Sequence, residues 1–292
     1  MEIQTSAKTS APSECLVCQS HRFRAVRNYE SPFTHNEYTL YSCDDCQSYF
    51  FFIEQTPMDL EKVYEQYAQE KIEPFNTQFN PSSYWKHQVD TICRLCKRPI
   101  HSVMDVGCRT GDFLMHWPKE IRRVGTELSE SWASVARQRG LSVVQGFIEN
   151  MEFDKQFDVI TCYAIVEHLR EPIPFLVRLS NLIHKDGIVV VMTPTHECFK
   201  QKVLFAVGRQ WHMYSPPQHL NFLSRKKLDE TMEKHGFTLV ARKYTSGGMF
   251  HPFRKVPLVR YAFSKVMALW DVYSPLSSLP IFDHMYSYYV RG

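Results

Sequence analysis

Short apolar runs alternate with helix-like stretches from residue 99 onward. Strands are predicted at 103–106, 123–126, 142–145, 157–163 and 188–192, and helices at 112–117, 129–139 and 173–184. The strongest strand, 188–192, is apolar at every position, which is typical of a strand that helices cover on both faces. Alternation of such strands with helices predicts a parallel sheet of the doubly wound α/β class.

The regular alternation breaks after Pro194. Two insertions are predicted at 195–223 and 247–282, with a helix at 225–235 and strands at 237–244 and 285–291. Ser224 is a suitable N-cap for that helix, and Gly236 a suitable residue to end it. Long excursions at the carboxyl edge of a parallel sheet often carry function, so we expect the first insertion to help form a substrate pocket. In the second, the helix-like segment 259–270 could bind a partner or a membrane surface, but burial against the main domain is favoured.

The N-terminal residues contain two Cys-x-x-Cys pairs. The four cysteines are Cys15, Cys18, Cys43 and Cys46. Alternation across 37–42 predicts short strands between the pairs, so they form a zinc ribbon after a disordered lead at 1–13. Four thiolates complete a tetrahedral shell and leave no position for substrate, which predicts structural Zn²⁺. Free or redox-active cysteines are the alternative.

Residues 55–98 are predicted to form two helices that link the ribbon to the main domain and cover its ligand cleft. The second helix carries an apolar stripe that includes Trp85, Ile92 and Cys96. Cys93 and Cys96 form a third pair, for which a packing role is favoured over metal binding. The expected division is therefore a lead and ribbon at 1–54, a helical linker or lid at 55–98, and an α/β domain at 99–292.

Composition limits the class of protein. The 292 residues are 44% hydrophobic and 22% charged, which is ordinary for a globular protein. A net charge of +3 with scattered basic residues does not favour a dedicated nucleic-acid binder. No signal peptide or transmembrane run is apparent, so we expect a cytoplasmic protein whose partner is a small-molecule substrate.

The most informative segment is 103–114, which reads V-M-D-V-G-C-R-T-G-D-F-L. A strand passes into a helical pattern through a turn that contains Gly107 and Gly111. Glycines allow a sharp turn and close approach of a ligand to backbone N–H groups. Glu127 ends the next strand, where a carboxylate can accept both ribose hydroxyls of an adenosine. These features together predict a nucleotide-like cofactor site.

The loop D-V-G-C-R-T-G lacks the spacing of a dinucleotide site and resembles the glycine loop of class I S-adenosylmethionine-dependent methyltransferases. Further similarity lies in G-T-E-L-S, E-N-M-E-F, F-D-V-I and E-H-L, in that order. The resemblance covers roughly 99–292, includes the quinone-biosynthesis O-methyltransferases, and implies a Rossmann-like seven-stranded sheet with an antiparallel edge. The ribbon ahead of it is similar to that of a bacterial subgroup that modifies sugars and other small metabolites.

The resemblance also implies which residues contact S-adenosylmethionine. They are Asp105, Gly107, Cys108, Arg109, Gly111, Asp112, Glu127, Leu128, Phe147, Ile148 and Tyr163. Arg109 departs from the family because it replaces the middle glycine, so its side chain must point away from the cofactor or reach its carboxylate. Phe147 replaces an acidic residue that meets the adenine amino group in many relatives. Phe147 is expected to pack on the adenine ring while the Ile148 N–H contacts the edge of that ring.

His168 is the candidate catalytic base, because it follows a strand at the edge where the methyl group should project. The alternative is that the Glu167-His168 pair caps a helix or orients a loop. Quinone-biosynthesis relatives place a second Glu where this chain has Ala164, which disfavours a metal-assisted mechanism. Candidate substrate contacts from the first insertion are His212, Tyr214 and His219, with His196 as a further secondary candidate.

The function predicted from the sequence is methyl transfer to a small molecule, such as a sugar, a nucleotide sugar, a cell-envelope precursor or a secondary-metabolite precursor. One alternative is an RNA or protein methyltransferase that docks its substrate through the ribbon. Modest basicity and the acidic and aromatic residues around the second cysteine pair weigh against it. The other alternative is a catalytically silent binding protein.

Overall fold

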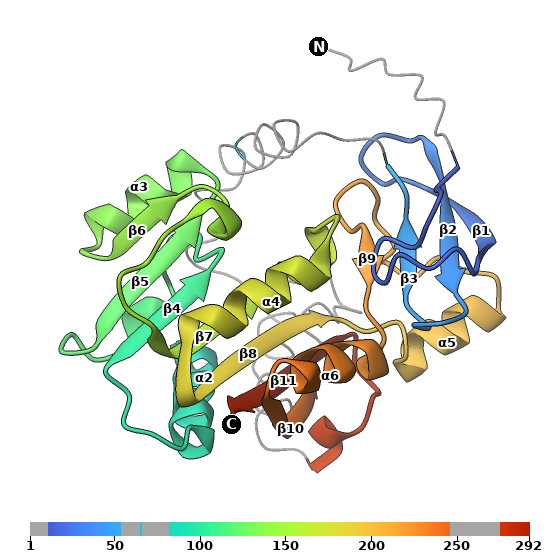
Figure 1. Cartoon of the computed structure of the whole chain (residues 1–292). Coiled ribbons are helices and arrows are strands. Elements are labelled where there is room, and N and C mark those ends of the chain that lie inside the picture. Colours follow the sequence, from blue (N-terminus) through green and yellow to red (C-terminus); the bar gives the residue numbers. More distant parts are fainter. Residues whose placement is uncertain (1–10, 54–64, 66–81, 246–274) are drawn as a thin grey trace, which may run out of the picture.

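A computed structural model describes residues 11–53, 65, 82–245 and 275–292 (Figure 1). The predicted helix within 57–67 and the helix-like segment 259–270 therefore lie outside the described residues. No helix in the described ranges is long and apolar enough to cross a membrane.

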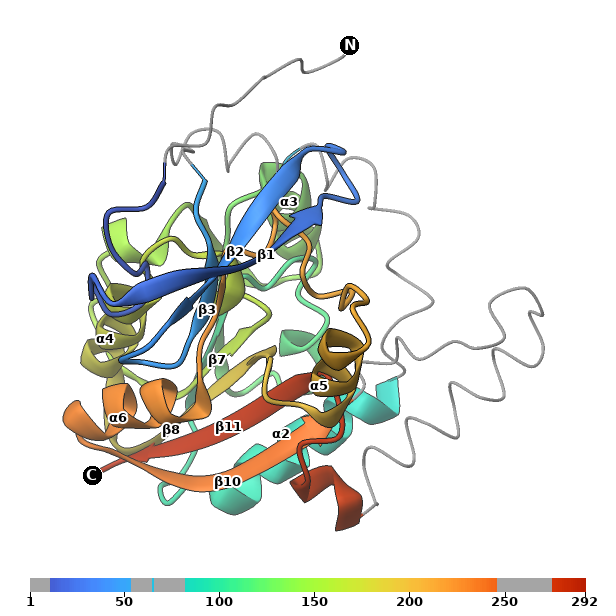
Figure 2. The same cartoon turned by 90° about the vertical axis from the view of Figure 1, so that its right-hand side faces the viewer.

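The larger sheet has seven strands in the order β10-β11-β8-β7-β4-β5-β6. Their bounds are β4 Ser102–Val106, β5 Arg122–Glu127, β6 Ser142–Gln145, β7 Phe157–Tyr163, β8 Ile183–Pro194, β10 Phe237–Thr245 and β11 His284–Arg291. Strands β4 to β8 are parallel, whereas β11 pairs antiparallel with both β8 and β10 (Figure 2). The predicted parallel sheet with an antiparallel edge is confirmed.

Helices cover both faces of this sheet. They are α2 Ser82–Leu95, α3 Glu130–Gln138, α4 Pro172–Leu182 and α6 Arg225–Lys234. Successive residues of β8 point to opposite faces: Val189 packs in the cluster that contains residues of α4 and α6, and Val190 in the one that contains residues of α2 and α3. The predicted cap at Ser224 is present, because its hydroxyl accepts a hydrogen bond from the N–H group three residues on, and Ser129 caps α3 in the same way.

One predicted helix is much shorter in the structure. Instead of a helix over 112–117, a single 3₁₀ turn, η1, spans Leu114–His116. The next residue, Trp117, is extended with ψ of 145° and precedes Pro118. Proline disfavours helical dihedrals in the residue before it, so the chain leaves the helix there.

The N-terminal module is a second sheet that also contains a strand from the first insertion. Strands β1 Phe23–Glu30, β2 Glu37–Cys43 and β3 Tyr49–Phe51 pair in order, and β9 Asn221–Phe222 adds to β3 (Figure 1). The insertion also forms helix α5 Phe199–Ala206. Ser224 strengthens the junction, because its hydroxyl donates to the Cys46 carbonyl at 2.6 Å. The first insertion is therefore part of the ribbon's sheet.

Asn221 joins this sheet to the loop that follows β7. Its side-chain amide donates to the carbonyls of Val166 and Leu169 at 2.8 and 2.7 Å, and the residue is fully buried. The Val166 carbonyl also accepts the Leu169 N–H at 3.2 Å, so the amide adds a second donor there and is the donor that the Leu169 carbonyl receives from β9. The sheet thus fixes the position of the segment between these two residues, which contains His168.

Replacing Asn221 with alanine should lower the free energy of unfolding by about 2 kcal/mol, because two buried or part-buried hydrogen bonds are lost and a small cavity opens. Urea denaturation of the variant and of Asn150→Ala, an exposed position, provides the measurement. A loss no larger than that of Asn150→Ala would contradict the role given to this amide.

Candidate functional site

The carboxyl ends of β4, β5, β6 and β7 open into one cavity of about 490 Å³. Gly107 follows β4, Glu127 ends β5, Phe147 follows β6 and Tyr163 ends β7, and all four line the cavity. Neighbouring parallel strands bring their carboxyl ends to one edge, which is where open α/β sheets bind ligands.

Both glycines of the loop are required by packing. Gly107 and Gly111 have left-handed φ values of 71° and 79°. A Cβ on Gly107 would lie 2.2 Å from Ile165 Cδ1, and one on Gly111 would lie 2.1 Å from Leu141 Cδ1. A larger residue would therefore be strained at either position, and the end of the neighbouring side chain would have to move to make room for it.

Glu127 is the central carboxylate of the cavity. It is 5% exposed, and its oxygens accept the N–H groups of Arg109, Leu128 and Ser129 at 2.9, 2.9 and 3.0 Å. Burial raises its pKa, while these three donors act in the opposite direction. Each carboxylate oxygen can accept more than one hydrogen bond, so the group can still bind hydroxyls.

Arg109 occupies the loop position that is glycine in many relatives, and it adopts a left-handed φ of 50°. Its guanidinium lies 4.3 Å from the centre of the Trp132 ring, and both residues line the cavity. The side chain therefore turns toward α3 and forms part of the cavity wall. Its charge helps to stabilise the ionised form of Glu127 and lowers the pKa of His168.

The other end of the cavity is rich in histidine. The four histidines that line it are His168, His212, His219 and His284. His168 Nδ1 lies 2.6 Å from the Gln218 carbonyl, and His219 Nδ1 lies 2.8 Å from the Met213 carbonyl. A carbonyl only accepts, so in each neutral ring the proton is on Nδ1 and the lone pair is on Nε2. Burial lowers the pKa of His168 to about 4 and that of His219 to about 3, so both are neutral near pH 7.

Glu167 lies beside these two rings, and one ligand atom from each of Glu167, His168 and His219 lies within 4.8 Å of the others. Burial raises the pKa of Glu167 to about 8, and Thr193 donates its hydroxyl to the carboxyl group at 3.1 Å. Ala164 supplies no second carboxylate, so the cluster offers two imidazoles and one carboxyl group. These groups can exchange protons with a bound molecule, and they are also donors that a divalent metal ion accepts.

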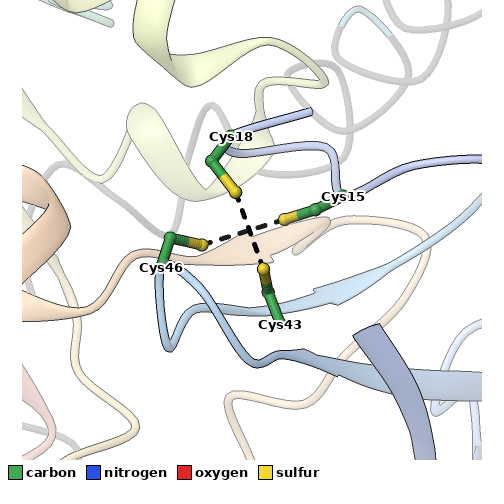
Figure 3. A group of neighbouring side chains, drawn as sticks. All are labelled: Cys15, Cys18, Cys43 and Cys46. Carbon is green, nitrogen blue, oxygen red and sulfur yellow. Dashed lines mark hydrogen bonds between the residues drawn. The ribbon is translucent and has the colours of Figure 1, made fainter. Parts of the chain in front are cut away.

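The four N-terminal cysteines form a second cluster, remote from the cavity in sequence (Figure 3). The sulfur atoms of Cys15 and Cys46 are 3.8 Å apart, and those of Cys18 and Cys43 are 3.6 Å apart. Four thiolates about 2.3 Å from a tetrahedral zinc have sulfur atoms about 3.8 Å apart. The spacing therefore fits a four-coordinate metal ion.

Most residues predicted for the site line the cavity. These are Gly107, Arg109, Glu127, Leu128, Phe147, Ile148, Tyr163, His168, His212 and His219. Asp105, Cys108, Gly111 and Asp112 are outside its lining. Asp105 is instead buried beneath the loop, where it accepts the Thr161 hydroxyl at 2.6 Å and where burial raises its pKa to about 7.

Two candidates from the first insertion lie elsewhere. Tyr214 is 1% exposed, packs against Phe222 and accepts the Gln201 amide at 2.9 Å. It is a core residue of the ribbon junction, so the structure does not support a contact with substrate. His196 is buried against Tyr49, with ring centres 4.5 Å apart, and is also outside the cavity lining.

Sequence reasoning missed other residues of the cavity wall, chiefly Pro32, Phe33, Trp132 and His284. Trp132 follows the predicted cap of α3 and could have been assigned to the sheet-facing side by helical spacing. Pro32 and Phe33 lie in the hairpin between β1 and β2, and no local pattern relates that hairpin to the glycine loop.

Comparison with known proteins shows the fold and the family to which this chain belongs. The fold resembles S-adenosylmethionine-dependent methyltransferases. One neighbour is magnesium protoporphyrin IX methyltransferase from Synechocystis with bound SAH, with a TM-score of 0.54 at 12% identity, covering 81% of this chain and 100% of that one. A second, from Clostridium acetobutylicum, has a TM-score of 0.51 at 11% identity, covering 79% and 99%. A methyltransferase-domain family model matches residues 61–242, more than half of the chain, and the chain belongs to that family.

Sequence comparison adds further relatives. The tRNA U34 carboxymethyltransferase of Photobacterium profundum is 27% identical over 47% of this chain and 44% of its own length. The ubiquinone biosynthesis O-methyltransferase of Azoarcus sp. is also 27% identical, over 64% of this chain and 85% of its own length. The chain spans 44% of the length of the first of these relatives, and 44% of a Rickettsia prowazekii ubiquinone biosynthesis O-methyltransferase.

Proposed function

We propose that this protein transfers the methyl group of S-adenosylmethionine to a hydroxyl group of a small molecule. The observation that carries the proposal is one cavity that joins the glycine loop and Glu127 at one end to the paired imidazoles of His168 and His219 at the other. A methyl donor and an acceptor bound in the same enclosed space are held in line and away from water.

The cofactor end offers the groups that an adenosine requires. Glu127 would accept the ribose hydroxyls, Phe147 would pack on the adenine, and the Ile148 N–H would contact the edge of the ring. Gly107 lets the backbone turn where the methionine part would lie. When bound, the cofactor supplies an electrophilic methyl group on sulfur.

His168 is proposed as the base that removes the acceptor's proton. The carbonyls of Gln218 and Ala164 raise its pKa, but burial together with Arg109 outweighs them and keeps the ring neutral near pH 7, which is the form that can accept a proton. The alternative role as a helix cap is disfavoured, because α4 has Glu171 at its N-cap and the Glu167-His168 pair lies in the preceding 3₁₀ turn, η3 Val166–His168. Glu167 orients the loop through Thr193.

The cysteine cluster is proposed to hold a structural Zn²⁺. Four protein thiolates leave no open coordination position, so the ion would organise the ribbon without taking part in the reaction. The ribbon's sheet in turn supports the loop that carries His168, through β9 and Asn221.

A role for the ribbon in docking RNA or protein has less support. The edge of β3 that could add a partner's strand is paired with β9, and the hairpin tip lines the cavity. The pairing with β9 and the position of the hairpin tip both favour a role of the ribbon at the enclosed cavity over a role in docking a macromolecule. Tight, salt-sensitive RNA binding or methyl transfer to RNA would favour the alternative.

Changing His168 to alanine should leave the dissociation constant for S-adenosylmethionine within about twofold and reduce turnover by about 100-fold, because only the proton acceptor is lost. Glu127→Gln should instead weaken the binding of S-adenosylmethionine by at least about tenfold. Calorimetry and transfer of a radiolabelled methyl group to a panel of hydroxyl acceptors measure the two effects, with His101→Ala as an exposed control. Wild-type protein without cofactor affinity would refute the proposed function, and unchanged turnover in His168→Ala would refute the base.

Changing Arg109 to glutamine should move the acidic limb of the turnover profile to higher pH. Turnover requires neutral His168 and falls as pH drops through its pKa of about 4. Loss of the neighbouring cation makes protonation easier, so that pKa rises. His219 and Glu167 also face the ring and are unchanged in the variant. The profile is compared with that of Arg123→Gln on β5, and a limb that stays in place or moves to lower pH would contradict the effect.

Changing Cys43 to serine should lower the zinc content from about one ion per chain and reduce the Tm by roughly 5–10 °C, because the ribbon loses a ligand and with it the support of β9. Metal analysis and thermal unfolding test this, with Cys93→Ser as a control, since Cys93 is exposed on α2. Equal zinc content in the two variants would exclude the four-cysteine site.

A further inference from the structure

The tip of the β1–β2 hairpin reaches the proposed reaction cavity. Pro32 and Phe33, at this tip, line the same space as Glu127 and His168. Phe33 is 52% exposed, although a phenylalanine at a hairpin tip usually gains nothing from contact with water. An exposed aromatic ring at the wall of a cavity is typical of a surface that a ligand covers.

The tip has a defined conformation. Ser31 is fully buried, and its hydroxyl oxygen accepts the N–H groups of Phe33 and Thr34, each at 3.1 Å. The Ser31 N–H donates to the Asn36 carbonyl at 2.8 Å, and its carbonyl accepts the His35 N–H at 3.1 Å. These hydrogen bonds lie within the turn and fix its backbone conformation, so Phe33 is held in one position.

The base of the hairpin is anchored to the first insertion. The Gln210 side chain donates to the carbonyls of Glu30 and Tyr214 at 3.2 and 2.8 Å. The rings of Tyr29 and Tyr214 pack with their centres 5.1 Å apart. Because both contacts join the hairpin to residues that precede His219, the tip is fixed relative to the histidine end of the cavity.

Charges in the cavity are distributed unevenly. Among the described residues that line it, Arg109 is the only Lys or Arg, and its guanidinium lies over Trp132 at the cofactor end. Burial lowers the pKa of each lining histidine, so the rings carry no positive charge near pH 7. Lys200 is close to His212 but pairs with the buried Asp283 at 2.8 Å. An anionic acceptor would lose its hydration at the histidine end without gaining a cation from the described part of the lining.

We propose that the ribbon's hairpin tip is part of the acceptor site and that this site selects an uncharged acceptor with an apolar ring or chain beside its hydroxyl group. Phe33 and Pro32 supply an apolar wall from one side, and Met213 and Pro217 supply one from the insertion. The hydroxyl group then lies toward the acceptor nitrogens of His168 and His219. This inference rests on the proposed function, and it excludes phosphorylated and carboxylated acceptors, nucleotide sugars among them.

The test uses the full-length zinc-loaded protein saturated with S-adenosylhomocysteine. The probes are para-butylphenol and its carboxylated counterpart, hydroxyphenylbutyrate, with dissociation constants from ligand-observed NMR. We expect the uncharged probe to bind at least about tenfold more tightly, because only the carboxylate must be desolvated without a partner. Phe33→Ala should weaken its binding by about tenfold, and Phe33→Leu by less, since leucine keeps part of the apolar area.

Phe199→Ala is the matched control, because Phe199 is 65% exposed on α5 and lies outside the cavity lining. Zinc content and cofactor affinity should be the same in all variants. Equal affinity for the two probes, no binding of either, or a Phe33→Ala variant that behaves like Phe199→Ala would overturn the inference. Failure of the wild-type protein to bind S-adenosylhomocysteine would instead refute the proposed function.

Discussion

The hydrogen bonding of β9 is the interaction on which the arrangement of the site depends. On one side, the Leu220 carbonyl accepts the Phe51 N–H at 2.8 Å, which joins the insertion to the ribbon. On the other, the Leu220 N–H donates to the Glu167 carbonyl at 2.7 Å, and Asn221 holds the two carbonyls that flank His168 in the chain. A strand of only two residues, together with the residue before it, thus connects the ribbon to the loop that contains His168. Loss of any of these bonds would weaken that connection, because hydrogen bonds away from water are costly to break.

This connection explains why one cavity has two chemically different ends. At the proposed cofactor end, the loops after β4 and β5 supply backbone donors that stabilise a buried carboxylate, Glu127. At the other end, the insertion and the ribbon supply neutral imidazoles and apolar side chains, of which those of Pro32 and Phe33 lie furthest away in the sequence. The proposed donor, which is charged and rich in hydroxyl groups, and the proposed uncharged acceptor would each be matched by one end.

Local signals in the sequence predicted much of the fold, while the missed features depend on distant contacts. Ser224 marks a helix start by its chemistry, and the offset between Gly107 and Glu127 predicts the proposed cofactor end, because both effects act over short stretches of the chain. The helix predicted at 112–117 is wrong, because Pro118 disfavours helical dihedrals in Trp117 and only a 3₁₀ turn forms there. No periodic pattern in the sequence indicates β9 or the approach of the hairpin tip to the cavity. The burial of Tyr214 depends on the pairing of β9 with β3. Such contacts depend on how the ribbon's sheet lies against the larger sheet, which no local sequence pattern indicates.

Arg109 shows how strain in the loop relates to chemistry. A non-glycine residue in the left-handed region costs on the order of 1 kcal/mol, and glycine would serve the loop's geometry without that cost. Packing of the guanidinium on Trp132 offsets part of it. The charge has a further effect, because it favours ionised Glu127 and neutral His168 at the same time. This cation therefore adds to the larger effects of burial and backbone donors in the direction that the proposed roles of Glu127 and His168 need, which is a reason for arginine to occupy a position that the backbone alone would assign to glycine.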